Sequence, residues 1–272
     1  MDALILIGGR SRRMGLDKAL VERPDGSRQI DWLVHLALQA GTRPLVSMRD
    51  ASPPPVDLPV IADSRPGAGP LGAFAAYHAR RPGKPVLVLG GDLFLLDAAT
   101  VKHLLDHRDP ARRATCFANR IDGRPEPLCT IYESSGISQA VKWLDRGDHH
   151  VRHFLESLDP LVLELPHPAA LDSVNTPLQL VECFAKLTRG VVPKLVRVRY
   201  PAGLREARGL EDGQAATLAC TAAGLYEELR FRHCLPLEID ALRVARNGDG
   251  CAWDEPLSEN DELVFTPHPA GG

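Results

Sequence analysis

The fold is decided by the stretch ALILIGGRSRRMGLDK, which occupies residues 3–18. It begins with five consecutive apolar residues, a pattern typical of a strand that is buried on both faces of a parallel sheet. The glycine pair Gly8-Gly9 follows soon after, and glycines let a backbone approach a ligand closely. Because ligands of such sheets bind beyond the carboxyl ends of the strands, the sequence predicts a ligand site directly after Ile7.

The same stretch carries four cations, namely Arg10, Arg12, Arg13 and Lys18. Successive backbone N–H groups can cradle phosphate oxygens, and arginine and lysine place positive charge beside them. The spacing fits neither a P-loop nor the G-x-G-x-x-G dinucleotide fingerprint. A glycine turn with solvated arginines is the simpler interpretation, but strand, glycines and cations together favour a phosphate site.

Strands and helices alternate through the first part of the chain. Apolar strands are expected at 59–62 and 86–89, and the spacing of apolar residues predicts amphipathic helices at 30–38 and 71–78. Strands separated by helices indicate βαβ units with right-handed crossovers. The sequence therefore predicts an α/β domain with a mostly parallel sheet over residues 1–189.

Residues 190–272 follow a different pattern and are net acidic, whereas residues 1–190 are close to neutral. Gly190 and Pro193 end the preceding helical pattern. A half-buried strand is expected at 196–200, a helix at 222–229 with Thr221 as its N-cap, and a last strand at 263–265. The dipeptide Asn247-Gly248 is a strong hairpin signal. These elements predict a small α+β domain over residues 190–272.

Composition excludes several classes of protein. The formal net charge is −3, so no global basic field exists to hold nucleic acid. The apolar runs are far shorter than a membrane helix needs, and the first residues do not resemble a signal peptide. Six cysteines show no C-x-x-C pair, which favours reduced thiols in a cytoplasmic protein.

The segment from Leu6 to Lys18 resembles the signature L-x-G-G-x-S-x-R-M-G-x-D-K of the molybdenum cofactor guanylyltransferases. Further segments agree with that family in the same order along the chain. They are Asp63 with Pro66-Gly67-Ala68-Gly69-Pro70-Leu71-Gly72, then Gly91-Asp92, Arg124-Pro125-Glu126-Pro127-Leu128, and Val174-Asn175-Thr176-Pro177. The resemblance implies a Rossmann-like nucleotidyltransferase domain over most of residues 1–189.

The resemblance also implies roles for individual residues. The backbone of Leu6, Ile7, Gly8 and Gly9 would hold the nucleotide, and Arg13 and Lys18 would face the triphosphate. Asp63 and Asp92 would contact the nucleotide, and Asp92 would hold Mg²⁺. Asn175 would help to bind the pterin or the metal. The implied reaction is attack by the terminal phosphate of molybdenum-bound molybdopterin on the α-phosphorus of GTP, with pyrophosphate leaving. Mg²⁺ keeps several waters, so one carboxylate is enough protein ligation.

Two departures from the family leave alternatives open. The family often carries Pro-Cys-Asp-x-Pro at its metal site, where this chain has Gly90-Gly91-Asp92-Leu93-Phe94. Ser47-Met48-Arg49 stands where the family usually has an asparagine-bearing segment. Gly8-Gly9 favours GTP over CTP, but an enzyme using CTP or a sugar phosphate, or a first half that only binds nucleotide, stays open. Asp63 and Asp92 can also be turn or helix-cap residues.

The chain ends in TPHPAGG, residues 266–272, in which prolines prevent a continued strand ladder. The segment from about 193 to 272 resembles the small sulfur-carrier subunit of molybdopterin synthase, a ubiquitin-like β-grasp protein. The matching stretches are Leu204-Arg205-Glu206, residues 257–262 and the final F-x-P-x-x-A-G-G. The resemblance implies that an E1-like enzyme adenylates Gly272, and that its thiocarboxylate supplies sulfur to the large synthase subunit. A flexible terminus is the plainer alternative.

Three histidines lie close together in the sequence, at positions 149, 150 and 153. On a helix, His149 and His153 would share one face at i and i+4 and could bind a metal. No carboxylate partner is specified by the spacing, so a solvated helix start is the favoured interpretation.

Overall fold

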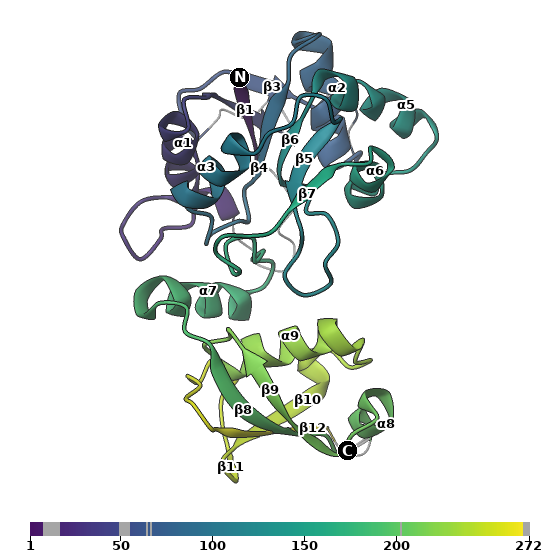
Figure 1. Cartoon of the computed structure of the whole chain (residues 1–272). Helices are drawn as coiled ribbons and strands as arrows, with labels where there is room; N and C mark the ends of the chain where they lie inside the picture. The colour runs from purple at the N-terminus through teal and green to yellow at the C-terminus, as the bar shows by residue number, and fades with distance from the viewer. Residues whose placement is uncertain (8–16, 49–54, 64, 66, 202, 269–272) are drawn as a thin grey trace. The chain divides into compact units, whose positions relative to one another are not determined.

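The computed structural model describes residues 1–272 except 8–16, 49–54, 64, 66, 202 and 269–272 (Figure 1). The chain divides into two compact units, Met1–Ser173 and Val174–Gly272. Each unit has its own hydrophobic core, built from its own strands and helices.

The first unit is built on a seven-stranded sheet with the order β3-β2-β1-β4-β6-β5-β7. All neighbouring strands run parallel except at β6, which is antiparallel to both β4 and β5. The mostly parallel sheet predicted from the sequence is therefore confirmed. The strands are β1 Asp2–Leu6, β2 Arg43–Met48, β3 Val60–Ala62, β4 Val86–Gly90, β5 Ala114–Phe117, β6 Cys129–Tyr132 and β7 Leu161–Leu163.

Helices cover both faces of this sheet, because β1 and β4 are apolar on both sides. On one face Leu4 and Val88 pack with Phe74 of α2 and with Phe154 of α6. On the other face Ile5 packs with Leu87 and Leu89 of β4 and with side chains of α1 and α3. The helices are α1 Gln29–Gln39, α2 Pro70–Arg80, α3 Ala98–Asp106, α4 Ser134–Ile137, α5 Gln139–Asp145 and α6 Val151–Ser157, with the 3₁₀ turn η1 at Lys18–Leu20.

The register brings four strand ends to one edge of the sheet. Leu6 at the end of β1 lies opposite Ser47 of β2 on one side and Gly90 of β4 on the other. The antiparallel strand β6 starts at this edge, since Cys129 pairs with Leu89. Segments that follow β1 and β4 or precede β6 are therefore neighbours, although they are far apart in the sequence.

The second unit contains a five-stranded sheet with the order β11-β10-β12-β8-β9. Strands β8 and β12 are parallel and central, and the other pairs are antiparallel. Asn247 and Gly248 both have positive φ, at 54° and 94°, in the turn between β10 and β11, so the predicted hairpin is confirmed. The strands are β8 Lys194–Arg199, β9 Asp212–Thr217, β10 Leu242–Arg246, β11 Asp249–Gly250 and β12 Glu262–Pro267.

One long helix packs on this sheet in the manner of a β-grasp fold. Helix α9 contributes Leu225, Tyr226 and Leu229 to the core, and Thr221 caps it by accepting a hydrogen bond from the Gly224 N–H, as predicted. The helices of this unit are α7 Pro177–Arg189, α8 Leu204–Arg208 and α9 Ala222–His233, with the 3₁₀ turn η2 at Ile239–Ala241. The sheet and α9 together give the ubiquitin-like α+β class expected from the sequence.

Helix α7 belongs to this second unit. Gly190, with φ of 80°, ends α7, so the sequence signal near 190 marks the end of a helix. The division between the compact units lies earlier, after Ser173. The reason is that α7 packs against α9, through a contact between polar side chains that hydrophobic periodicity does not reveal.

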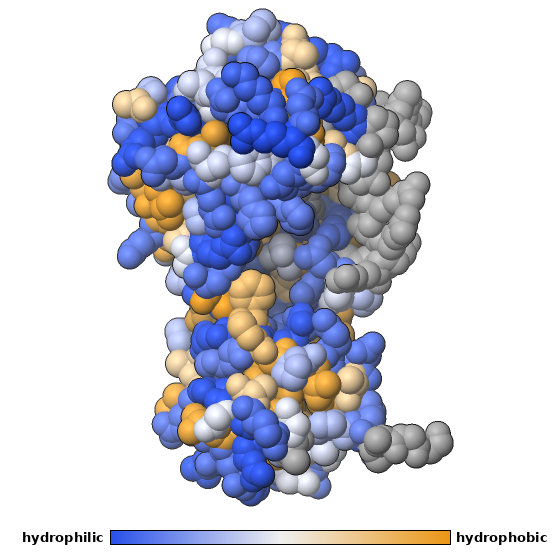
Figure 2. Space-filling view, turned by 90° about the vertical axis from the view of Figure 1, so that its right-hand side faces the viewer, coloured by the Kyte–Doolittle hydropathy of each residue, from blue (hydrophilic) through white to orange (hydrophobic). Residues whose placement is uncertain are grey.

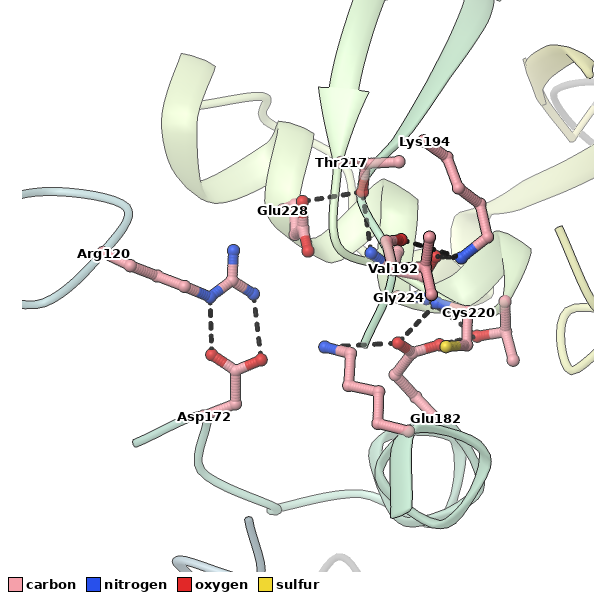
Figure 3. Close-up of polar contacts among 12 residues, drawn as sticks. Arg120, Asp172, Glu182, Val192, Lys194, Thr217, Cys220, Gly224 and Glu228 are labelled. Atoms are coloured by element: carbon pink, nitrogen blue, oxygen red, sulfur yellow. Dashed lines mark hydrogen bonds and ion pairs between the residues drawn. The ribbon is translucent and has the colours of Figure 1, made fainter. Parts of the chain in front are cut away.

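The carboxylate of Glu182 carries this contact, which we call the Glu182 cap. It accepts hydrogen bonds from the Cys220 N–H at 2.6 Å and from the Thr221 hydroxyl at 2.7 Å, and Lys186 Nζ lies 3.3 Å away (Figure 3). Glu182 and Lys186 are both buried. The negative charge thus lies at the start of α9, where the helix dipole favours it.

Hydrophilic side chains and free thiols characterise the described residues. On the face drawn in Figure 2, hydrophilic residues cover most of the first unit. None of the helices in the described part of the chain combines the length and the apolar character that crossing a bilayer requires. All six cysteines lie among the described residues and are free thiols, four of them buried.

Candidate functional site

Lys18 and Asp92 meet at the carboxyl edge of the first sheet, as the sequence predicts for a site. Lys18 begins η1, where the side chain of Asp17 caps the turn by accepting from the Ala19 N–H at 3.0 Å. Asp92 follows β4. Lys18 Nζ lies 4.0 Å from Asp92 Oδ2, and the two side chains are 16% and 21% exposed. Residues 74 positions apart thus place an ammonium group and a carboxylate together in a largely buried position.

Burial disfavours the charged form of both partners. It raises the pKa of the Asp92 carboxyl, and the nearby Lys18 charge opposes that rise. It also lowers the pKa of the Lys18 ammonium, against which Asp92 acts. Each charge therefore lacks the hydration that it would have in water. A ligand that brings an opposite charge to either group is bound more favourably for that reason.

The altered turn at residues 90–94 has a steric reason. The Gly91 N–H donates to the Leu6 carbonyl at 3.0 Å, which holds the turn against the end of β1. A Cβ at position 91 would lie 2.7 Å from that same Leu6 oxygen, and one at position 90 would lie 2.8 Å from Asp92 Oδ1. Gly90 and Gly91 thus allow a close approach that any other residue would disturb.

Two side chains from the α1 region hold the turn from its other end. Arg23 Nη1 donates to the Phe94 carbonyl at 2.7 Å, and Trp32 Nε1 donates to the Leu96 carbonyl at 2.8 Å. The Arg23 guanidinium lies 4.7 Å from the centre of the Trp32 ring. Nothing in the sequence marked these residues, because a single arginine before a helix carries no recognisable pattern.

The backbone of Leu6 and Ile7 is engaged within the sheet. The Ile7 N–H donates to the Ser47 carbonyl at 3.1 Å, and the Leu6 carbonyl accepts from Gly91. The segment that follows starts at Gly8. Gly8, Gly9 and Arg13 lie outside the described residues, as does Gly272 at the other end of the chain.

Asp63 follows β3 and packs against the start of α2. Its Oδ1 accepts from the Arg65 N–H at 2.8 Å. Gly72 lies so close to this carboxylate that a Cβ there would overlap it. The aspartate and the last glycine of the predicted D…G-P-L-G segment are thus in contact, which explains physically why they occur together.

Glu126 is a half-buried carboxylate at the same edge, and the sequence patterns gave it no role of its own. It precedes β6, it accepts a hydrogen bond from the Asn119 side chain, and Arg152 lies 3.2 Å away. Burial raises the pKa of Glu126, and the Asp92 charge contributes to the rise. The two carboxylates therefore lie within electrostatic reach of each other. The R-x-E-P-L segment was the signal that could have found it.

Asn175 belongs to the second compact unit. Its backbone N–H donates to Gln179 Oε1 at 2.7 Å, next to a capping box in which Thr176 and Gln179 exchange hydrogen bonds. Pro177 occupies the first turn of α7, where its missing N–H costs nothing. The N-T-P motif is thus a helix start.

The three histidines lie exposed at the start of a helix, which is the interpretation that the sequence favours, and His149 and His153 do not share a helix face. Helix α6 begins at Val151, so His149 lies before it and His150 is its N-cap. His150 and His153 are instead brought together around Asp148.

Comparisons with known proteins agree with this geometry. The model of the MobA-like NTP transferase domain matches residues 3–161, and the ThiS family model matches residues 198–272. Molybdopterin-guanine dinucleotide biosynthesis protein A from Archaeoglobus fulgidus superposes with a TM-score of 0.58 at 20% identity, covering 70% of this chain and all of that one, which shows a shared fold.

Two relatives are similar in sequence. A probable molybdenum cofactor guanylyltransferase of Opitutus terrae is 32% identical over 159 residues, 57% of this chain and 77% of that protein. A molybdenum cofactor biosynthesis bifunctional protein of Synechocystis is 28% identical over 177 residues, 64% of this chain, and the match spans about half of its length, 51%. Both family resemblances seen in the sequence are confirmed. The chain belongs to the MobA-like NTP transferases, a family of nucleotidyltransferases, and carries a ThiS family domain over residues 198–272.

Proposed function

We propose that the first unit transfers a guanylyl group from GTP to molybdenum-bound molybdopterin, and that the second unit is a sulfur carrier for molybdopterin synthase. The names of the Opitutus terrae and Synechocystis relatives support this pair of activities. In the proposed reaction an oxygen of the terminal molybdopterin phosphate forms a bond to the α-phosphorus of GTP. The bond to the β-phosphate oxygen breaks, and pyrophosphate leaves.

The observation that carries the proposal is the largely buried pair of Lys18 and Asp92, in which Nζ lies 4.0 Å from Oδ2. Such a transfer needs alignment and charge neutralisation more than a nucleophilic side chain. A triphosphate arriving at this edge would attract Lys18 and draw it from Asp92. Before the substrate binds, the charges of Lys18 and Asp92 compensate each other. Once it binds, Lys18 can pair with phosphate and Asp92 can bind a metal ion.

The Asp92 side chain fits Mg²⁺. It offers hard carboxylate oxygens, and its burial makes an added positive charge favourable. When bound, Mg²⁺ would neutralise charge on the phosphates. Glu126 is the second carboxylate near that position, but its contacts with Asn119 and Arg152 already satisfy it.

The remaining residues take the roles that the family suggests. We assign Gly8 and Gly9 to phosphate contacts through their N–H groups and Arg13 to the triphosphate, next to Leu6 and Ile7 at the end of β1. Asp63 contacts the nucleotide from the end of β3. Asn175 is assigned to pterin binding.

The second unit would act through its terminal Gly-Gly. An E1-like enzyme would join the Gly272 carboxylate to AMP from ATP, with release of pyrophosphate. A sulfur donor would then displace AMP to give a thiocarboxylate, and the large subunit of molybdopterin synthase would use its sulfur. The β-grasp sheet and the ThiS family match, which runs to residue 272, support this role.

The transferase is tested by pyrophosphate release with Mg²⁺, molybdenum-bound molybdopterin and either GTP or CTP. We expect release with GTP, and the Asp92→Asn variant should lose at least about a hundredfold in rate because a charge that binds the metal is removed. Asp106→Asn is the matched control, since Asp106 is exposed and pairs only with Lys102 among the described contacts. Release with CTP alone would reassign the base, and equal rates in both variants would remove Asp92 from the mechanism.

Deletion of Gly271 and Gly272 tests the carrier separately. We expect the shortened chain to form no thiocarboxylate with an activating enzyme and a sulfur source, because its terminal acceptor is gone. Nucleotidyl transfer should be unchanged. Intact-mass spectrometry detects the +16 Da change expected when sulfur replaces one oxygen, about the mass difference of those two atoms. A thiocarboxylate on the shortened chain would contradict the assignment.

A further inference from the structure

A cluster of metal-ligating side chains lies outside the site just described. Asp148 Oδ1 is 2.9 Å from His150 Nδ1, and Asp148 Oδ2 is 4.0 Å from His153 Nδ1. The two imidazole rings have centroids 5.0 Å apart. One ligand atom from each residue lies within 4.8 Å of the others, and among the described residues this is the one such group of three.

The backbone fixes this arrangement. Gly147, with φ of 80°, turns the chain after α5, and the Asp148 carboxylate then accepts the His150 N–H at 2.8 Å. His150 is the N-cap of α6, and His153 stands in its first turn. Helix α6 is held in place by the buried side chains of Phe154 and Leu155. The three ligands therefore start from a turn that is held by a hydrogen bond and by the buried side chains of α6, which reduces the entropy lost when they converge.

We propose that Asp148, His150 and His153 bind a divalent transition cation of the zinc class. Two imidazoles and one carboxylate suit Zn²⁺, Ni²⁺ or Cu²⁺, whereas Mg²⁺ prefers oxygen ligands alone. Bonds of about 2.0–2.2 Å require ligand atoms about 3.4 Å apart in a tetrahedral site. The histidine side chains are 76% and 53% exposed, so rotation of their side chains can close the remaining gap. Water fills the positions that the three ligands leave open.

A bound cation would also affect the neighbouring turn of α6. Arg152, between the two histidines, lies 3.1 Å from Asp122 and 3.2 Å from Glu126. A cation that holds the start of α6 therefore also holds Arg152, which pairs with the loop before β6. We expect binding to raise the melting temperature of the full chain, since the cation binds the folded arrangement only.

The test titrates Zn²⁺ alone into the metal-free full chain by calorimetry. His153→Gln should weaken the strongest site by at least about tenfold, and Asp148→Asn should do the same. His149→Gln is the matched control: it removes an imidazole that is also exposed and lies next to the cluster in the sequence, and it should leave the affinity unchanged.

Helix α3 offers a second control, because His103 and His107 stack at 4.1 Å but provide only two ligands. His103→Gln should leave the strongest site intact, and the thermal shift caused by Zn²⁺ should persist there and vanish in His153→Gln. Zinc binding that is equally strong in His153→Gln, or equally weakened in His149→Gln, would overturn the proposal and point to other ligands such as the exposed thiol of Cys234.

Discussion

Arg23 is a buried cation whose hydrogen bonds join two distant parts of the first unit. Its Nη1 atom donates to Gln29 Oε1 at 2.8 Å and to the Phe94 carbonyl at 2.7 Å, and its side chain is 4% exposed. A buried charge is tolerated only when it is well hydrogen-bonded. Arg23 thus ties the start of α1 to the turn that presents Asp92.

We expect Arg23→Met to destabilise the first unit. Methionine keeps most of the volume but removes the donor of two buried hydrogen bonds, each worth about 0.5–1.5 kcal/mol. Arg112→Met is the control, because Arg112 is 45% exposed and pairs with Asp159 at the surface, where a change of about 0.5 kcal/mol or less is usual. Urea unfolding followed by circular dichroism measures both. Equal midpoints would show that Arg23 contributes no more than a surface residue.

The sequence identifies residues that act locally and misses those that act across the fold. Lys18 and Asp92 could be predicted because each follows an apolar strand of a parallel sheet and lies in a family motif. Arg23 could not, since its partner Phe94 is 71 positions away and only the folded chain brings them together. The Asp148 cluster could not be predicted for a local reason: the exact start of α6, at Val151, decides which histidine turns toward the carboxylate.

At the scale of elements, the contact between α7 and α9 depends on a glycine. A Cβ at Gly224 would lie 2.6 Å from Glu182 Cδ and Oε2, in the middle of the Glu182 cap. The carboxylate is held by Cys220, Thr221 and Lys186, so it cannot move aside without losing those partners.

Gly224→Ala should therefore destabilise the second unit by about 1–3 kcal/mol, as overpacking of a filled site does. The sign is diagnostic, because the same change in an unhindered helix stabilises by about 1 kcal/mol. Gly213→Ala in β9 is the matched control, as no atom lies within 4 Å of a Cβ there. Hydrogen exchange of the α9 amides measures the difference. Stabilisation by Gly224→Ala would show that the carboxylate is not fixed.

Strands and helices were predictable where apolar periodicity decides them, as in β1, β4, α1 and α9. The placement of α7 was not, because the face it buries carries Glu182, Cys183 and Lys186. Apolar periodicity predicts a helix before Gly190, but it does not show which unit that helix joins, because the buried contact is made by charged partners.

At the scale of the whole molecule, the carrier unit should need α7. A fragment of residues 174–272 keeps the capping box and the Glu182 cap, whereas a fragment of residues 191–272 lacks both. We expect the longer fragment to be more stable by at least about 1 kcal/mol, the scale of one such buried hydrogen bond. Thermal unfolding of the two fragments gives the comparison, and Glu182→Gln in the longer one should fall between them. Equal stability of the two fragments would show that α7 does not stabilise the carrier unit and serves only as a connection.

Because the two cores belong to one polypeptide, the two units are made in equal numbers. Each synthesis of the chain yields one nucleotidyltransferase unit and one unit with the ThiS family domain, so synthesis cannot raise the amount of one without the other. Under the proposed function, the early and late steps of cofactor assembly could be balanced only by how fast each unit turns over and how soon each is degraded.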